Sequence, residues 1–398
     1  MCIICCKRVE DIVHMKVIDI SECLIITEIP KELVNMERLD CPGCTNLTHI
    51  PNELVNLKSL DCSGCNITYI PNTLVNLERI CCSDCEGITE IPGELVNLKG
   101  ISCCCCEGLT EIPGGLVKLE ELVCFDCTQL KNISKELIKL GCIDCSDCPL
   151  LTHIPKELVN LRSLNCSRCP TLKEIPKELV KLHYLNCYNC PLLTHIPKEL
   201  INLTNLYFGK CDNIKYIPKE LIDLTGMGCC AELTEIPKEL VKLKHLSCSN
   251  PTIPKELVNL KILSLTNSHI SSIPKFDNLK TLKCIECPNL TEIPELVNLE
   301  LLACNKCPQL RYIPTTMKLI TFACENCPSL MVAPEHICNN TLKQLITTNY
   351  QKYRKEGCKK LIDTILEELI TKTWEPTRAM TWCKDEDEKK FMNEWFTS

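Results

Sequence analysis

The sequence predicts an α/β repeat fold in which short coils of chain stack into one curved solenoid. An Ile-Pro dipeptide or a close equivalent recurs, mostly at intervals of 20 or 21 residues, along most of the 398-residue chain. Cysteine occurs 37 times and falls mainly at two fixed positions of the same period. Periods of 20 to 50 residues are typical of solenoids, because each repeat buries its apolar face only against its neighbours.

One unit illustrates how each coil is built. Its apolar residues follow the order Leu57-x-x-Leu60-x-Cys62-x-x-Cys65-x-Ile67-x-x-Ile70-Pro71-x-x-Leu74-x-x-Leu77. Side chains alternate along a strand, so Leu60 and Cys62 should face inward and Asp61 outward. About 17 such strands, the last at residues 345–347, would form one curved parallel sheet. The rest of each unit would return along a mostly irregular, extended outer face.

This unit resembles the leucine-rich repeat, whose consensus is L-x-x-L-x-L-x-x-N/C-x-L. The resemblance covers the successive units over about residues 15–349. The resemblance implies a non-enzymatic solenoid that binds a protein partner through its concave face. The Cys-rich Ile-Pro-Lys-Glu-Leu units and a Trp/Arg/Trp-acidic tail further resemble the uncharacterised leucine-rich repeat proteins of mimivirus-like giant DNA viruses. That second resemblance implies the cytoplasm of an infected host as the setting, with host proteins as targets.

The period divides the chain into three parts. Residues 1–14 are expected to cap the first coil as an apolar strand, and residues 15–349 to form the solenoid. Units within about 221–274 are shortened, so the curvature should change there. Beyond residue 350 the period fails, and apolar residues between 351 and 372 recur at helical spacing. Residues 350–398 are therefore predicted to form a small helical cap or, alternatively, a docking tail.

Charge and hydropathy narrow the class of partner. The formal net charge of −7 argues against nucleic acid. No apolar run approaches the roughly 18 residues of a membrane helix, and the first residues lack the pattern of a secretory signal. We expect a monomeric, cytoplasmic protein that is not secreted, has mostly free thiols and needs no metal or cofactor.

Two columns account for 26 of the 37 cysteines. The strand column contains Cys41, Cys62, Cys82, Cys103, Cys124, Cys145, Cys166, Cys187, Cys229, Cys248, Cys284, Cys304 and Cys324. The turn column, three residues later in the repeat, contains Cys23, Cys44, Cys65, Cys85, Cys106, Cys127, Cys148, Cys169, Cys190, Cys211, Cys287, Cys307 and Cys327. The repeat already requires the resulting CxxC spacing, so we interpret these thiols as buried packing residues in preference to metal or redox sites. Turn cysteines should donate to backbone carbonyls, as Asn would.

Cysteines outside the columns leave two alternatives open. Cys2, Cys5 and Cys6 could be S-acylated and attach the protein reversibly to a membrane, although a capping role is preferred. A thiol enzyme would need a cysteine of the terminal region, such as Cys358 or Cys383. Cys383 begins a Cys-Lys-Asp element that resembles one in bacterial effector ubiquitin ligases.

Outward-facing strand residues supply the candidate binding positions. Only 4% of residues are aromatic, yet tyrosine and asparagine cluster in two adjacent units, a composition common at protein interfaces. The rings could equally just cover the open side of the sheet. A structural protein that forms layers or assemblies is a separate alternative for the function. Cys81, Cys104 and Cys142 are also expected at the sheet surface or its rim. The predicted partner-binding residues are Tyr184, Asn186, Tyr188, Asn205, Tyr207, Asp40, Asp61 and Asp144, with Trp374, Arg378, Trp382 and Trp395 if the tail docks.

Overall fold

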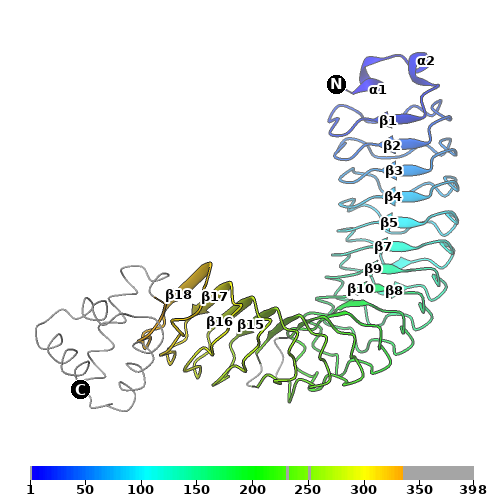
Figure 1. Ribbon diagram of the computed structural model, residues 1–398. Coiled ribbons are helices and arrows are strands. Elements are labelled where there is room, and N and C mark those ends of the chain that lie inside the picture. Colours follow the sequence, from blue (N-terminus) through cyan, green and yellow to red (C-terminus); the bar gives the residue numbers. More distant parts are fainter. Residues whose placement is uncertain (1, 230–232, 250–251, 335–398) are drawn as a thin grey trace, which may run out of the picture. The chain divides into compact units, whose positions relative to one another are not determined.

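The protein is a parallel β-solenoid with almost no helix among its described residues (Figure 1). The computed structural model describes residues 2–229, 233–249 and 252–334. The chain divides into two compact units, Met1–Leu224 (unit 1) and Thr225–Ser398 (unit 2). The division falls within 221–274, where the repeats shorten.

Unit 1 holds ten strands of the main sheet, paired in parallel in chain order. They are β1 (Val17–Asp19), β2 (Arg38–Asp40), β3 (Ser59–Asp61), β4 (Arg79–Cys81), β5 (Gly100–Ser102), β7 (Glu121–Val123), β9 (Cys142–Asp144), β10 (Ser163–Asn165), β11 (Tyr184–Asn186) and β12 (Asn205–Tyr207). Two short strands of the return segments, β6 (Glu111–Ile112) and β8 (Asn132–Ile133), form a separate parallel pair. One strand per repeat unit is therefore confirmed here.

Unit 2 continues the pattern with strands of up to five residues. They are β13 (Gly226–Gly228), β14 (His245–Cys248), β15 (Ile262–Thr266), β16 (Thr281–Ile285), β17 (Leu301–Asn305) and β18 (Thr321–Glu325), paired in parallel in that order. The strand predicted at 345–347 and the predicted helical C-terminal cap at 350–398 lie outside the described residues.

The core of each coil is aliphatic and thiol-lined. In the unit analysed above, Leu60, Cys62, Cys65 and Ile67 are all at most 1% exposed. Full burial of a leucine side chain contributes roughly 1.5–3 kcal/mol, and these residues recur in every coil. Stacking of coils therefore supplies the hydrophobic stabilisation that a single unit lacks.

An asparagine ladder on the return segments joins neighbouring coils. The Nδ2 atom of Asn56 donates to the carbonyl oxygen of Val34 at 2.8 Å, 22 residues earlier. Asn97 and Asn160 make the same contact with the preceding coil. The side-chain amides thus satisfy backbone carbonyls that have no strand partner.

Each coil turns through a residue with left-handed backbone conformation, placed directly before the turn cysteine. Gly43 and Gly64 hold this position with φ of 72° and 67°. Most other coils place a residue with a side chain there, for example Asp84 and Cys105 with φ of 56° and 55°. Such residues carry a steric cost that glycine avoids.

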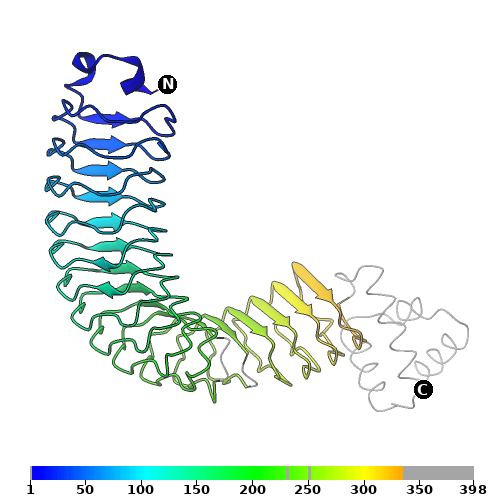
Figure 2. The ribbon, with the colours of Figure 1, turned by 180° about the vertical axis from the view of Figure 1, so that it is seen from behind.

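The expected N-terminal capping strand is absent, because residues 3–12 form two helical turns, α1 (Ile3–Cys6) and α2 (Val9–Ile12). They lie beside β1 at the end of unit 1 (Figure 2), and Ile12 is fully buried. The turns bond internally, since Lys7 N donates to Ile3 O and Val13 N to Val9 O. A strand would instead have created a new sheet edge.

No helix within the described residues is both long and apolar enough to cross a membrane.

Candidate functional site

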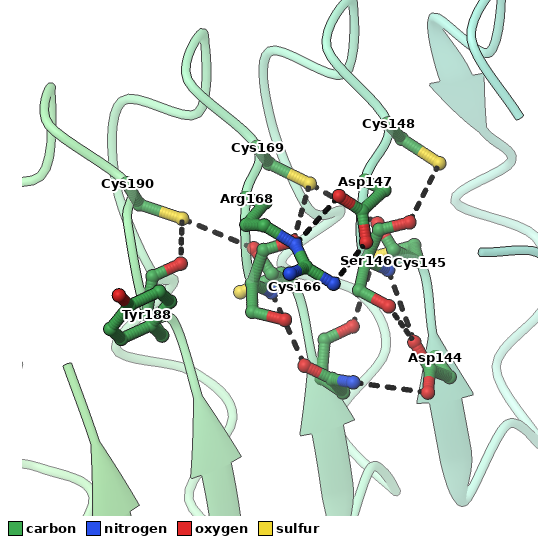
Figure 3. A network of polar contacts seen from close by, with 12 residues as sticks. Asp144, Cys145, Ser146, Asp147, Cys148, Cys166, Arg168, Cys169, Tyr188 and Cys190 are labelled. Atoms are coloured by element: carbon green, nitrogen blue, oxygen red, sulfur yellow. Dashed lines mark hydrogen bonds and ion pairs between the residues drawn. The ribbon is translucent and has the colours of Figure 1, made fainter. Parts of the chain in front are cut away.

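The two cysteine columns pack inside the coils, except that Cys324, predicted to be buried, is half-buried in β18, the last strand of the described residues. The turn column bonds to backbone carbonyls as predicted. The Sγ atom of Cys65 donates to the carbonyl oxygen of Cys41 at 3.1 Å, and Cys190 donates to Cys166 O at the same distance. Figure 3 shows this contact for Cys169 and Cys190. The acceptor belongs to the strand column of the preceding coil, 24 residues earlier. A turn thiol that makes this bond therefore links two coils.

The strand thiols are chemically protected. A hydrogen bond with the turn thiol of the next coil, followed by burial, raises the pKa of Cys62, Cys103 and Cys187 well above the usual thiol range. The thiolate is the reactive form of cysteine, so this environment suppresses nucleophilic and redox chemistry. Hydrogen bonds of the same kind lower the pKa of the turn thiols Cys65, Cys127 and Cys211, so this protection applies to the strand column.

A cluster of tyrosine and asparagine side chains lies on the open face of the sheet at β11 and β12. We call Tyr184, Asn186, Tyr188, Asn205 and Tyr207 the tyrosine patch. Tyr184 pairs in register with Asn205, and Asn186 with Tyr207. The rings of Tyr184 and Tyr207 are 5.9 Å apart between centroids and tilted by 49°. The structure thus brings the predicted residues of two adjacent units into one surface.

The rings of the patch are partly ordered by their neighbours. All five side chains are half-buried. Burial, and then the proximity of Tyr207, raise the pKa of Tyr184 above its ordinary value. Lys210 places its ammonium group 5.6 Å from the ring centre of Tyr188, a cation–π distance.

Asp144 lies on the same face, near the patch, within a network of polar contacts (Figure 3). Its Oδ1 accepts from the amide and the hydroxyl of Ser146 at 3.1 and 2.7 Å. Its Oδ2 accepts from Nδ2 of Asn165 at 3.0 Å. At the adjoining turn, Arg168 forms an ion pair with Asp147 at 2.7 Å. These contacts hold the carboxylate in one orientation.

Asp40 and Asp61 lie far from the patch in sequence, on β2 and β3, and form a separate acidic row. They pair in register with each other, and Asp40 also pairs with Asp19, which the sequence reasoning missed. Arg38 Nε bonds Asp40 Oδ2 at 2.8 Å, whereas Asp61 accepts from the Ser63 amide and hydroxyl. Repeat register alone would have identified Asp19, because it occupies the same position of the first unit.

The surface cysteines only partly match expectation. Cys81 and Cys142 are half-buried on the sheet face, as predicted. Cys104, expected at the surface, is only 4% exposed and contacts Ser102 and the carbonyl of Val123. Neighbouring groups cover the outward-facing side chain of Cys104. The alternation of side chains along a strand does not predict such a contact.

The amino-terminal thiols converge. Cys2 Sγ lies 3.4 Å from Cys5 Sγ, which lies 3.8 Å from Cys23 Sγ of the first coil. The thiol of Cys2, then burial, raise the pKa of Cys5 to about 12. Burial would raise the pKa of Cys23, but hydrogen bonds from the Ile25 amide and from Cys2 lower it to about 6. Cys6 is exposed and stands apart from this group.

The return side of unit 1 carries an open hollow lined by the repeated Ile-Pro-Lys-Glu segments of residues 132–218. Its lysines and glutamates alternate, as in Lys177 and Glu178, so the lining offers little net charge to a ligand. The predicted tail residues Trp374, Arg378 and Trp382, together with Trp395, lie outside the described residues.

The strand register, the asparagine ladder and the buried thiol columns together define a parallel β-solenoid built from stacked repeats. A family model described as Leucine Rich Repeat matches residues 56–77 and 181–203. These two segments of the chain therefore match leucine-rich repeats.

Solved structures share this fold at low sequence identity. A leucine-rich repeat protein of Leptospira interrogans is 22% identical, with 80% of this chain and 94% of that chain covered and a TM-score of 0.61. The functional domain of InlJ from Listeria monocytogenes, which includes a cysteine ladder, is 19% identical, with 81% and 68% covered and a TM-score of 0.54. No curated protein matches the chain significantly in sequence.

Proposed function

We propose that the protein is a non-enzymatic scaffold that binds a protein partner through the open sheet face of unit 1, centred on the tyrosine patch. The observation that carries this proposal is the gathering of Tyr184, Tyr188 and Tyr207 on adjoining coils of a chain with few aromatic residues. Solenoids use their extended sheet surfaces for binding, because outward side chains vary without disturbing the core.

The patch has the physical properties of a contact surface. Tyrosine has few rotatable bonds, so it buries a large area at a small entropic cost, and its hydroxyl still offers a hydrogen bond. The mutual contact of Tyr184 and Tyr207 limits their motion before a partner arrives. The fixed carboxylate of Asp144 adds an anionic acceptor. A partner that fits would present an apolar or aromatic side chain beside a cationic one.

The buried thiols support a reducing setting for this activity. The turn cysteines act as S–H donors to backbone carbonyls, a role that requires the reduced form. We therefore propose a cytoplasmic setting, which would be the cytoplasm of an infected host if the resemblance to giant-virus proteins reflects its origin.

Affinity capture with a matched control tests the proposal. The triple variant Tyr184→Ala, Tyr188→Ala and Tyr207→Ala should lose its partner, whereas the control Tyr69→Ala with Tyr216→Ala should retain it. The control tyrosines are 44% and 68% exposed and precede Ile-Pro on the return side. Tyrosines at the centre of an interface contribute more than about 1 kcal/mol each, so the triple variant should bind more than tenfold more weakly.

Site-specific crosslinking then separates direct contact from an indirect effect. A photo-crosslinking residue at Ser163, on β10 opposite Tyr184, should capture the same partner, and one at Lys198 on the return side should not. Equal capture by the triple variant and the control would contradict the proposal. Loss of the partner only after deletion of residues 350–398 would move the site to the tail.

A further inference from the structure

Three thiols converge where the N-terminal cap meets the first coil. The Sγ atoms of Cys2, Cys5 and Cys23 all lie within 4.8 Å of one another, and we call them the cap cysteine cluster. Among the described residues, no other group of three or more potential metal ligands has its ligand atoms this close together. Cys2 and Cys5 belong to the α1 turn, and Cys23 to the turn after β1.

Cys23 differs from the rest of the turn column in what it can bond. Later members donate to a strand carbonyl 22 to 24 residues earlier, as Cys44 does to Ile20 O at 3.1 Å. The residues directly before β1 form α1 and α2 instead of a coil, so Cys23 faces no such carbonyl. Its buried sulfur lies against Cys5 Sγ at 3.8 Å. The repeat therefore sets the place of Cys23 in the turn, but the coil-to-coil bond does not account for its contact with Cys5.

We propose that the cap cysteine cluster binds one zinc ion through the three thiolates of Cys2, Cys5 and Cys23. Zinc–thiolate bonds are about 2.3 Å long, and tetrahedral geometry then separates the sulfurs by about 3.8 Å. The observed separations of 3.4 and 3.8 Å are close to that value. Water would complete the fourth position, and the thiol protons are released to solvent when the ion binds.

The proposed ion has a structural role. It connects α1 to the first coil, where a solenoid needs a cap to cover its terminal core. Soft thiolate ligands favour zinc over calcium or magnesium, and a reducing compartment keeps the thiols available. Acylation of Cys2 or Cys5 would remove a ligand, so exposed Cys6 is the thiol that remains open to lipid.

Metal binding to the full chain tests the site. Protein purified under reducing conditions and stripped with a chelator would be titrated with Zn²⁺ against a chromophoric competitor. The variants are Cys5→Ser and the double variant Cys2→Ser with Cys5→Ser. The matched control is Cys81→Ser with Cys142→Ser, which removes two other half-buried thiols. Co²⁺ absorption would report tetrahedral thiolate coordination.

We expect one equivalent of zinc in the wild type and the control. Loss of an outer-shell partner weakens zinc binding about 10- to 100-fold, so loss of the Cys5 ligand should weaken it more than 100-fold. Zinc should raise the melting temperature of the wild type but not of the double variant. Circular dichroism would verify that the variants fold.

Several results would overturn the assignment. These are less than one equivalent of zinc in the wild type, equal affinity in Cys5→Ser and the control, or a disulfide or acyl group on the cluster in the reduced protein. Each can arise while the tyrosine patch still binds its partner, so the two proposals stand or fall separately.

Discussion

At the scale of single residues, the residue before a turn cysteine adopts a left-handed backbone conformation. This conformation carries a steric cost for any residue with a side chain, and it recurs at the same position from coil to coil. Gly43 and Gly64 occupy it without strain, but Glu22 in the first coil has the same conformation with φ of 56°. The sequence did not reveal this, because only two of the residues at the position are glycine and most of the others are polar or charged residues that also occur elsewhere in the coil. Backbone geometry, and not residue preference, identifies it.

At this position, replacing glycine by another residue should lower the free energy of unfolding, and replacing another residue by glycine should raise it. Gly64→Ala should lower the free energy of unfolding by about 1 kcal/mol, because alanine is strained at positive φ. An added Cβ at Gly64 would meet no atom nearer than 3.7 Å, so the effect would come from the backbone alone. Glu22→Gly should raise stability, and Gly141→Ala, which lacks positive φ, should not lower it. Urea denaturation measures the free energy of unfolding of all three variants. A Gly64→Ala variant as stable as the wild type would contradict the backbone explanation.

Glu37 should contribute an acid-sensitive part of the stability. Hydrogen bonds from Lys16 and Lys58, each at 2.6 Å, lower the pKa of Glu37 to about 2 from the ordinary 4.5. A carboxyl whose pKa is depressed on folding stabilises the protein above the unfolded pKa, and this contribution disappears as the pH falls through the folded pKa. The stability difference between wild type and Glu37→Gln should therefore be full at pH 7, decline below about 4.5 and vanish near 2.

Urea denaturation across this pH range measures that difference. The double variant Lys16→Gln with Lys58→Gln should show the same loss of pH dependence. A difference between wild type and Glu37→Gln that persists unchanged at pH 2 would contradict the assignment.

At the scale of elements, the repeat period predicted the strands of the described residues correctly, but it did not predict the contacts around them. Alternation in Leu60-Asp61-Cys62 is enough to assign inside and outside. The helical turns α1 and α2 were predicted as a strand, because Ile3 and Ile4 among cysteines suit either structure and no period extends there. The burial of Cys104 also depends on neighbouring coils. Local patterns therefore predict each unit better than they predict the ends.

The asparagine ladder can be tested by removing one of its hydrogen bonds and by adding a new one. Asn56→Ala removes the bond to Val34 O and should cost about 1 kcal/mol. Lys139 occupies the ladder position of its own unit, so Lys139→Asn should donate to Val117 O and stabilise by a similar amount. Thermal and urea denaturation check both changes, with Lys156→Asn on the return side as a control for charge removal. If Lys139→Asn has no more effect than that control, the ladder does not account for the stability.

At the scale of the whole molecule, the cysteine content follows from the repeat. The sequence register placed both columns in the core, correctly except for half-buried Cys324, and the structure adds the coil-to-coil bond of the turn thiols. The tyrosine patch could be predicted because its members share the repeat position of neighbouring strands. The cap cysteine cluster could not, since Cys2 and Cys23 are brought together only by the fold of the cap.

Thiol reactivity should therefore report unfolding along unit 1. In the native protein exposed Cys6 should react first, whereas fully buried Cys124, Cys145 and Cys166 should stay protected. Coils near an end of the unit have fewer stabilising neighbours, so Cys41 should become reactive at lower urea than these central thiols. Mass spectrometry after pulse labelling measures the order. Simultaneous labelling of all columns would instead indicate one cooperative transition.

The bond from each turn thiol to the preceding coil has an evolutionary consequence. Because donor and acceptor belong to different copies of the same unit, every junction between regular coils is interchangeable. Gene duplication or loss of a whole 21-residue unit would recreate the junction it interrupts. Excision of residues 145–165, for example, would leave Cys169 facing the carbonyl of Cys124 in place of that of Cys145. The shortened protein should therefore fold. The number of units in such a chain can change because the contacts at the new junction are of the same kind as those at the old one.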